Sequence, residues 1–372
     1  MRSVKSLKNI KGKKIIVRAD FNVPLKGNKV LDATRISVAL PTIEFLRKRG
    51  ARVILISHIG REPKESLKPV YNILKKKLPV KFVPELLGPR VEKIVSEMKS
   101  GEVILLENLR SNPGEKAGDL KFAHALAKLG DIYVNEAFPV SHRGDASIVG
   151  IPKYLPSYAG FQLEREVKEL SKVLKPKHPF LFILGGAKIE TKLPILKRFL
   201  KNADKVFVGG VLANNFFKAQ GYNIGASKYD ADAPSLSTLL KNPKLILPKT
   251  VVVADSSKKH KLVGTNEISD KEMVLDVGLP SIEALAPIIA KAKLILWNGP
   301  MGYYEGGYVQ GTEELLKLLA KAKGETIIGG GDTSVLVERK KLSHKFTFVS
   351  TGGGATLDFL AKGTLPGIKA LK

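Results

Sequence analysis

The chain has 372 residues, of which 44% are hydrophobic and 26% charged, a composition typical of globular proteins with two or three domains. It contains no cysteine, which excludes disulfides, thiol catalysis, iron–sulfur clusters and zinc sites built on thiolates. Its 62 lysines and arginines exceed its 35 aspartates and glutamates by 27, as in proteins that bind nucleic acids, membrane surfaces or anionic small molecules.

Short apolar runs alternate with helix-like segments through the first 160 residues. Such continuous apolar strands, separated by helices, are typical of parallel sheets covered on both faces. We therefore expect a doubly wound α/β domain, with strands at 15–17, 53–56, 80–83, 103–106 and 132–134 and helices that include 38–49 and 119–129.

The second half repeats this alternation after a charged segment, 162–174, which has helix-forming composition and precedes Pro176 and Pro179. We expect this segment to be a helix that joins two domains. The second domain is expected to have helices at 282–292 and 313–322, and strands at 180–184, 206–208, 251–253, 273–277, 294–297, 326–328 and 346–349.

Polar and basic residues follow the expected strands of the first half. Ligands of open parallel sheets bind beyond the carboxyl ends of the strands. Each cluster alone is also explained by an ordinary turn or an incidental loop. Arginine, or histidine with arginine, after three successive strands favours an anion site, and Arg35 opens the first helical segment. The residues concerned are Asp20, Asn22, Arg35, His58, Arg61, Arg110 and Arg143.

The expected strand ends of the second half are rich in glycine instead. Glycine lets backbone N–H groups approach phosphates closely, and a helix that follows adds its dipole. Lys188 and Lys192 would share one helix face, and Asp332 could hold Mg²⁺ beside a nucleotide. Tight turns alone would explain one such loop, whereas several favour a nucleotide site. The loops are 185–188, 209–210, 298–302, 329–333 and 351–355.

Several familiar motifs are absent from the sequence. It has no G-x-x-x-x-G-K-[ST], no G-x-G-x-x-G and no G-x-S-x-G, which argues against a P-loop, a common dinucleotide site and a nucleophile elbow. Its six histidines are scattered and form no metal-ligand pattern. No apolar run approaches the ~18 residues that span a bilayer, and we expect a cytoplasmic protein.

Nearly the whole chain resembles the phosphoglycerate kinase family. The resemblance rests on motifs in family order: R-x-D-F-N-V-P at 18–24, S-H-x-G-R at 57–61, E-N-L-R at 107–110, A-F-x-x-x-H-R at 137–143, G-G-A-K at 185–188, K-A-Q-G-Y at 218–222, W-N-G-P-M-G at 297–302, G-G-G-D-T at 329–333 and S-T-G-G-G-A at 350–355.

This resemblance implies an α/β fold of two Rossmann-like three-layer domains, whose parallel sheets are joined by a hinge helix. The implied parts are a 3-phosphoglycerate-binding domain at 1–160, the hinge helix at 161–175, a nucleotide-binding domain at 176–350 and a segment at 351–372 that returns to the hinge and the first domain.

The resemblance also implies roles for the residues of the first domain. Asp20 and Asn22 would bind the glycerate end of the substrate, and Arg35 would face the migrating phosphoryl group. The 3-phosphate would be held by His58, Gly60, Arg61, Arg110 and Arg143. We expect Arg18 to support Asp20.

The nucleotide side is implied in the same way. Lys188 and Lys192 would contact phosphates, Asp332 would position Mg²⁺, and Gly352 and Gly353 would donate N–H groups to the migrating group. Other implied contacts are Gly209 and Gly210 with adenine, Asn298, Pro300 and Glu305 with the nucleoside, and Gly330, Gly331 and Thr333 with the phosphates.

The implied reaction is reversible phosphoryl transfer between 1,3-bisphosphoglycerate and Mg-ADP, by a monomer that needs no nucleic acid or membrane partner. The stretch 136–147 departs from the family pattern, because Glu136 and Pro139 stand for its usual Asp and Gly, and Gly144-Asp145 is unusual. Two alternatives remain: a nucleic-acid-binding protein, suggested by the charge but supported by no binding motif, and a kinase for another acid.

Overall fold

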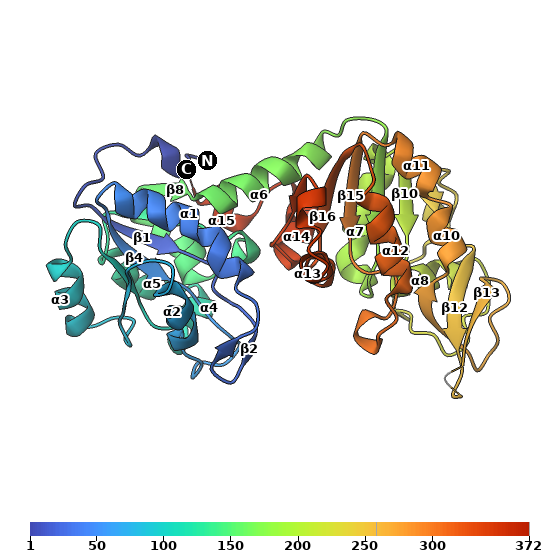
Figure 1. Cartoon of the computed structure of the whole chain (residues 1–372), viewed down its shortest axis with the longest axis horizontal. Coiled ribbons are helices and arrows are strands. Elements are labelled where there is room, and N and C mark those ends of the chain that lie inside the picture. Colours follow the sequence, from blue (N-terminus) through green and yellow to red (C-terminus); the bar gives the residue numbers. More distant parts are fainter. Residues whose placement is uncertain (258, 372) are drawn as a thin grey trace. The chain divides into compact units, whose positions relative to one another are not determined.

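The computed structural model describes residues 1–257 and 259–371. The chain forms two compact units (Figure 1). Unit 1 comprises 1–168 and 364–372, and unit 2 comprises 169–363. The chain passes from unit 1 to unit 2 within α6 (Phe161–Ser171). It returns to unit 1 at Thr364, later than the expected 351, because α14 (Gly354–Lys362) packs on α7 (Ile189–Asn202) of unit 2.

Unit 1 is built on a six-stranded sheet in the order β5-β6-β4-β1-β7-β8, in which every pair is parallel. Parallel strands need crossover connections, and helices provide them here. The strands are β1 (Lys14–Arg18), β4 (Arg52–Ile56), β5 (Lys81–Phe82), β6 (Val103–Leu105), β7 (Ile132–Asn135) and β8 (Ser157–Ala159). The helices include α1 (Thr34–Lys48), α2 (Lys68–Leu74), α3 (Pro89–Glu97), α4 (Gly114–Ala117) and α5 (Leu120–Ala127).

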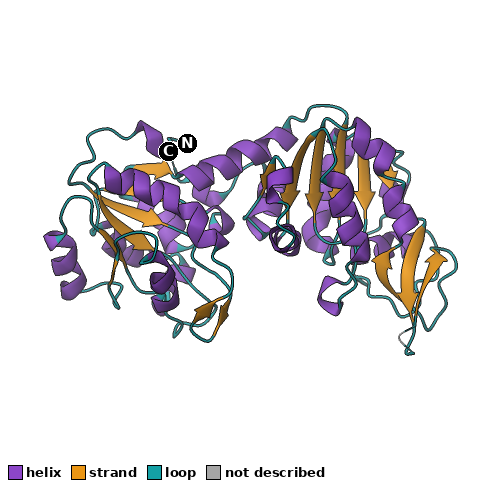
Figure 2. Cartoon of the chain, in the orientation of Figure 1, coloured by secondary structure: helices purple, strands orange, loops and turns teal. Residues whose placement is uncertain are grey.

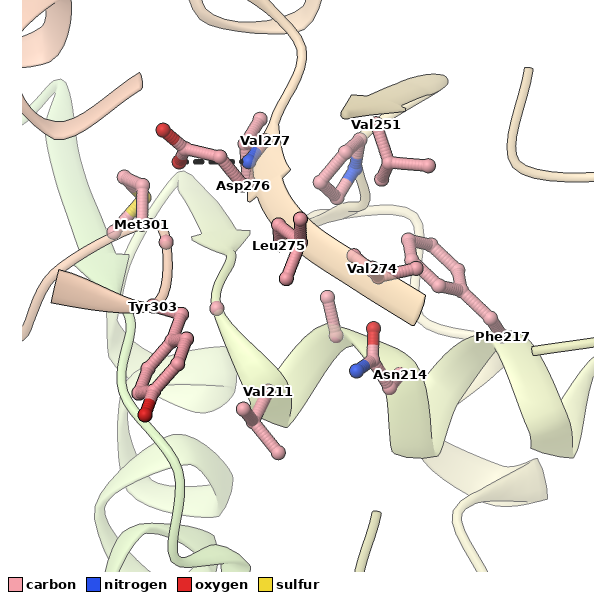
Figure 3. Close-up of a pocket in the computed structure, with 14 residues that line it drawn as sticks. Val211, Asn214, Phe217, Val251, Val274, Leu275, Asp276, Val277, Met301 and Tyr303 are labelled. Carbon is pink, nitrogen blue, oxygen red and sulfur yellow. Dashed lines mark hydrogen bonds between the residues drawn. The ribbon is translucent and has the colours of Figure 1, made fainter. Parts of the chain in front are cut away.

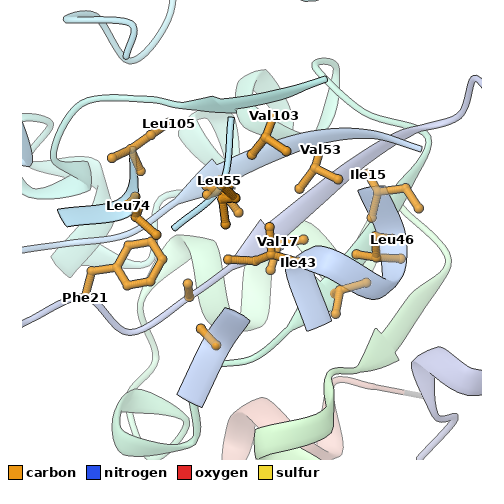
Figure 4. Close-up of a cluster of buried hydrophobic side chains, with 14 of the residues drawn as sticks. Ile15, Val17, Phe21, Ile43, Leu46, Val53, Leu55, Leu74, Val103 and Leu105 are labelled. Carbon is orange, nitrogen blue, oxygen red and sulfur yellow. The ribbon is translucent and has the colours of Figure 1, made fainter. Parts of the chain in front are cut away.

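Alternate residues of these strands form the core of unit 1 (Figure 4). Ile15 and Val17 of β1 pack with Ile43 and Leu46 of α1, because side chains two apart point to the same face of a strand. Ile16, between them, is also buried, since the sheet is covered on both faces. This rigid sheet sets the positions of the loops at its carboxyl edge.

Unit 2 contains a second parallel sheet of six strands, in the order β11-β10-β9-β15-β16-β17. The strands are β9 (Phe180–Leu184), β10 (Lys205–Val208), β11 (Leu245–Ile246), β15 (Leu294–Asn298), β16 (Glu325–Gly329) and β17 (Phe348–Val349). The expected α/β fold of two parallel-sheet domains is thus confirmed. Besides α7 and α14, the helices include α8 (Val211–Ala219), α10 (Leu279–Glu283), α11 (Ala286–Lys291), α12 (Gln310–Leu319) and α13 (Gly331–Arg339).

Two runs expected as strands of the parallel sheet form a separate antiparallel sheet instead (Figure 2). They are β12 (Thr250–Ala254) and β14 (Met273–Val277), and β13 (His260–Gly264) completes the sheet in the order β13-β12-β14. The central strand β12 runs antiparallel to both of its neighbours, and residues 255–259, which join it to β13, are too few for a crossover helix. In the part of the chain that is described, no helix is long and apolar enough to cross a bilayer.

Candidate functional site

In unit 1, residues after β1, β4, β6 and β7 carry the predicted anion site. These strands are neighbours and run parallel, so their carboxyl ends lie at one edge of the sheet. Asn22 Oδ1 accepts a hydrogen bond from the Gly60 amide at 2.9 Å, and Arg110 donates to the Gly60 carbonyl. The loops after β1, β4 and β6 therefore meet around Gly60.

Arg35 lies in the first turn of α1 and faces the loop after β1. Its Nη1 donates to Asp20 Oδ2 at 2.8 Å and to the Asn22 carbonyl at 3.1 Å. The Arg35 side chain is 33% exposed, so its guanidinium is held by one carboxylate yet open to solvent. This arrangement fixes the position of the Arg35 guanidinium and leaves part of it accessible to a ligand.

His58 is buried among guanidinium groups. Burial, followed by the charges of Arg18, Arg110, Arg143 and Arg35, lowers the pKa of His58 far below its usual value. The imidazole is therefore neutral near pH 7, and any anion it binds is held through a hydrogen bond. Arg61, predicted with this group, is exposed.

Arg143 belongs to the loop after β7 that departs from the family pattern. Its Nη1 lies 3.9 Å from Asp145 Oδ2, and both Arg143 and Asp145 affect the pKa of Arg110. Sequence reasoning left the position of this loop open. The structure brings Arg143 into the electrostatic environment of Arg110 and His58. The acidic Asp145, which was not predicted as part of the site, belongs to the same environment.

In unit 2, the glycine-rich loops surround a cavity of about 690 Å³. Lys188 is the N-cap residue of α7 and is exposed, and Asp230 Oδ2 accepts from the next amide, that of Ile189, at 3.0 Å. The predicted residues that line this cavity are Lys188, Lys192, Asn298, Pro300, Glu305, Gly330, Gly331, Asp332 and Gly353.

Lys192 is a buried cation at this cavity. Its Nζ donates to the Gly185 carbonyl, and burial lowers the pKa of Lys192 to about 8, against the opposing charge of Asp332. Asn298 is buried as well, and its Nδ2 has no hydrogen-bond partner among the described residues. A lysine and an unpaired amide donor at the same cavity are suited to anionic oxygens.

Helices α13 and α14 begin at the same cavity. Their N-cap residues, Gly330 and Gly353, have φ of 93° and 53° and no side chain that could cap the helix. Amide groups of a helix's first turn are left for a ligand when nothing caps them. The amide of Gly352 already donates to Ser350 Oγ at 3.1 Å, so Gly353 is the better placed donor.

Four predicted residues are not on the lining of this cavity: Gly209, Gly210, Thr333 and Gly352. Thr333 is buried, and its Oγ1 accepts from the Gly299 amide at 3.1 Å. Gly209 packs on Met301: a Cβ there would lie 2.7 Å from the methionine sulfur. Thr333 therefore holds the loop after β15 at Gly299, and the absence of a side chain at Gly209 lets Met301 pack closely against it.

An apolar slot of about 20 Å³ adjoins the cavity and shares Val211, Gly302 and Tyr303 with it (Figure 3). Predicted Gly210 lines this slot, and a Cβ at Gly210 would meet the Gly186 amide at 2.7 Å. Sequence reasoning missed its apolar lining, because such side chains look like core residues. They include Phe217, Val251, Val274, Leu275 and Val277.

Asp276 was also missed, although it binds the start of α12, which follows the loop that carries Glu305. It is buried between Gly302 and Gly311, and its carboxylate accepts from the Val277 amide at 2.9 Å (Figure 3). The carboxylate also accepts from the Gly311 amide at 2.9 Å. Burial raises the pKa of Asp276 to about 6. No sequence motif marks this residue, because its partners are backbone amides.

The residues at the larger cavity also fit a magnesium nucleotide. Among the described residues, no group of three or more histidines and carboxylates could hold a metal alone. Mg²⁺ usually takes one or two carboxylates together with substrate phosphates, and Asp332 supplies such a carboxylate beside uncapped glycine amides.

Comparisons with known proteins agree with this geometry. The family model described as phosphoglycerate kinase matches residues 4–363. A phosphoglycerate kinase from Moorella thermoacetica is 43% identical, over 97% of this chain and 97% of that protein. The structure of phosphoglycerate kinase from Coxiella burnetii has a TM-score of 0.86 and 36% identity, over 99% of this chain and 97% of that one. The structure from Pyrococcus horikoshii has a TM-score of 0.87 and 29% identity, over 100% and 98%.

Proposed function

The chain belongs to the phosphoglycerate kinase family, and from this we propose that it transfers a phosphoryl group reversibly between 1,3-bisphosphoglycerate and Mg-ADP, giving 3-phosphoglycerate and Mg-ATP. It is thus an ATP:3-phosphoglycerate 1-phosphotransferase of glycolysis. The observation that carries the proposal is the pairing, in one chain, of an arginine cluster at the sheet edge of unit 1 with a glycine-lined cavity in unit 2.

The arginine cluster supports binding of phosphoglycerate. We assign the 3-phosphate to His58, Gly60, Arg61, Arg110 and Arg143, since guanidinium groups bind phosphate through paired hydrogen bonds. Asp20 and Asn22 would orient the glycerate end. Arg35, held at 2.8 Å by Asp20, would face the group in transfer.

The larger cavity of unit 2 supports binding of the nucleotide. Lys188 and Lys192 would hold its phosphates, together with the amides at Gly330, Gly331 and Gly353 and the nearby Thr333 and Gly352. The base would lie at the side of this cavity that borders the slot, near Gly209 and Gly210, with Asn298, Pro300 and Glu305 around the nucleoside.

The proposed chemistry needs no general base. The attacking phosphate oxygen and the leaving carboxylate are already anionic, so catalysis consists of alignment and of stabilising charge on the transferred group. Arg35, Lys188 and the Gly353 amide would supply that stabilisation. Asp332 would hold Mg²⁺, which neutralises nucleotide phosphate charge when bound.

Substrate and nucleotide groups lie in different units, so transfer requires the two units to bring them together. We propose a hinge motion at α6, which would also exclude water from the reaction. The proposed enzyme acts as a cytoplasmic monomer on small anionic substrates, without a nucleic-acid or membrane partner.

A coupled assay with glyceraldehyde-phosphate dehydrogenase tests the function. ATP-dependent phosphorylation of 3-phosphoglycerate is expected, and Arg35→Ala and Lys188→Ala should each lower kcat by ~10²-fold or more with the fold intact. Lys76→Ala, at an exposed residue outside the site, is the control and should keep full activity. A folded wild-type protein without activity would refute the proposal, and activity on another acid in a substrate panel would identify a different acid kinase.

A further inference from the structure

Arg18, the last residue of β1, has a completely buried side chain, and its hydrogen bonds go to groups other than Asp20, which it was expected to support. Its Nε donates to Ser147 Oγ at 2.8 Å and its Nη1 to the Ala19 carbonyl at 2.6 Å. Its Nη2 lies 3.1 Å from His58 Nδ1. Arg18 therefore joins the His58 ring to the loop after β7.

This contact determines which ring nitrogen of His58 carries the proton. A guanidinium group only donates hydrogen bonds, so His58 Nδ1 must accept. A neutral imidazole has one N–H, which then lies on Nε2. The ring stays neutral because it is buried and because Arg18 from β1, Arg35 from α1, and Arg110 and Arg143 from the loops surround it.

The acidic groups near this cluster are paired with arginines. Glu115 Oε1 lies 3.8 Å from Arg18 and accepts from Ser147 Oγ at 2.6 Å, and Asp145 lies 3.9 Å from Arg143. Ser147 Oγ thus donates to Glu115 and accepts from Arg18 Nε. This pair of hydrogen bonds fixes the orientation of the Arg18 guanidinium group. Each of the three Arg18 nitrogens reaches a different acceptor, a spread that the single nitrogen of a lysine does not provide.

His58 Nε2 is buried and has no hydrogen-bond partner among the described residues. Buried donors are nearly always paired in folded proteins, so this one points to a ligand atom. An anionic oxygen is the acceptor that fits a donor surrounded by guanidinium groups.

We propose that Arg18 is a positioning residue, which holds His58 as the neutral tautomer so that Nε2–H donates to an anionic oxygen of the phosphoglycerate. This inference rests on the proposed function for the identity of the ligand. The tautomer itself is independent of that function and can be measured on the free protein.

Nitrogen NMR of protein labelled in its histidine side chains tests the tautomer directly. The His58 ring should carry its proton on Nε2 throughout pH 6 to 8. Adding 3-phosphoglycerate or inorganic phosphate should shift the Nε2 resonance, while Nδ1 keeps its acceptor signature. A proton on Nδ1, or a ring that titrates near its usual pKa, would overturn the proposal even if the enzyme is active.

Two substitutions of His58 distinguish the roles of its two ring nitrogens. In His58→Gln the side-chain amide reaches the place of Nε2, whereas in His58→Asn it reaches only that of Nδ1. We expect His58→Asn to raise KM for 3-phosphoglycerate by ~10-fold or more, as loss of a hydrogen bond to a charged group does, with His58→Gln recovering much of it. KM for ADP should stay unchanged in both, and equal losses in the two variants would contradict the assignment.

Arg18→Lys keeps the charge but removes the planar fork. It should raise KM for 3-phosphoglycerate more than it lowers kcat, and His58 should show both tautomers by NMR. An unchanged tautomer in folded Arg18→Lys would overturn the role of Arg18. If this variant does not fold, the wild-type spectrum and the His58 pair decide the question. A wild-type protein with the expected tautomer and no turnover would refute the proposed function instead.

Discussion

Lys192 lines the cavity where the nucleotide is proposed to bind, and it loses its charge in a pH range that kinetic assays can cover. Burial lowers its pKa to about 8, so the free protein holds this charge below pH 8 and loses it above. KM for ADP should therefore rise between pH 7.5 and 9.5, because binding of phosphates must then recharge the lysine. Lys192→Arg should show a flatter profile, since arginine stays charged, and an equally steep rise in that variant would exclude Lys192 as the cause.

Asp145 is expected to compete with the proposed substrate for the arginines of unit 1. Its carboxylate lies 3.9 Å from Arg143 Nη1, and its side chain is only 12% exposed. Asp145→Asn keeps the size but removes the charge, and should lower KM for 3-phosphoglycerate about 2- to 10-fold. Steady-state kinetics at constant ionic strength measures this change. A raised KM would mean that Asp145 supports Arg143 rather than competing with phosphate.

At the scale of elements, Glu136 anchors the start of the helix between the units. Its buried carboxylate accepts from Thr42 Oγ1 at 2.7 Å and from the Gln162 amide at 3.1 Å, and so connects β7, α1 and α6. These contacts link the helix that carries Arg35 and the loop that carries Arg143 to α6. Glu136 is one of the departures from the family pattern, and its surroundings explain its use as an anchor.

The pKa of Glu136 makes this anchor sensitive to pH. Burial raises the pKa of Glu136 from its usual 4.5 to about 8, so between these values the folded state holds a proton that the unfolded state releases. Its contribution to stability is complete below pH 4.5 and is lost as pH rises to about 8. Glu136→Gln should flatten the decline in the free energy of unfolding between pH 5 and 9, measured with urea. An unchanged slope would contradict this role, and Glu136→Ala should cost about 1–3 kcal/mol.

The sequence predicted best the buried strands and the residues that directly follow them. Most of the parallel strands were predicted because their apolar runs are continuous, and the side chains after them were found because parallel strands end at one edge. The short edge strands β8 (Ser157–Ala159) and β11 (Leu245–Ile246) were missed. β13 was missed because it begins with the polar His260 and Lys261, and its residues 260–262 are exposed. The partners of Arg18 were also missed: they depend on Ser147 and Glu115, which are distant in sequence and marked by no pattern.

At the scale of the whole molecule, the site explains only part of the net charge of +27. The arginines are concentrated where phosphoglycerate is proposed to bind, and Lys188 and Lys192 lie where the nucleotide would. The remaining lysines are dispersed, and they form a basic surface whose effect on anionic substrates depends on ionic strength.

Charge reversal far from the site measures this effect. Lys76→Glu with Lys77→Glu changes two exposed residues of unit 1 and, at two charges each, lowers the net charge from +27 to +23. At 0.01 M ionic strength the Debye length is ~30 Å, and kcat/KM for 3-phosphoglycerate should fall about two- to fivefold. At ~0.15 M the length is ~8 Å, and the same variant should match the wild type because only the arginines near the substrate still act. An equal loss at both ionic strengths would show that these lysines affect the site directly, and no loss at either would confine electrostatic attraction to the site itself.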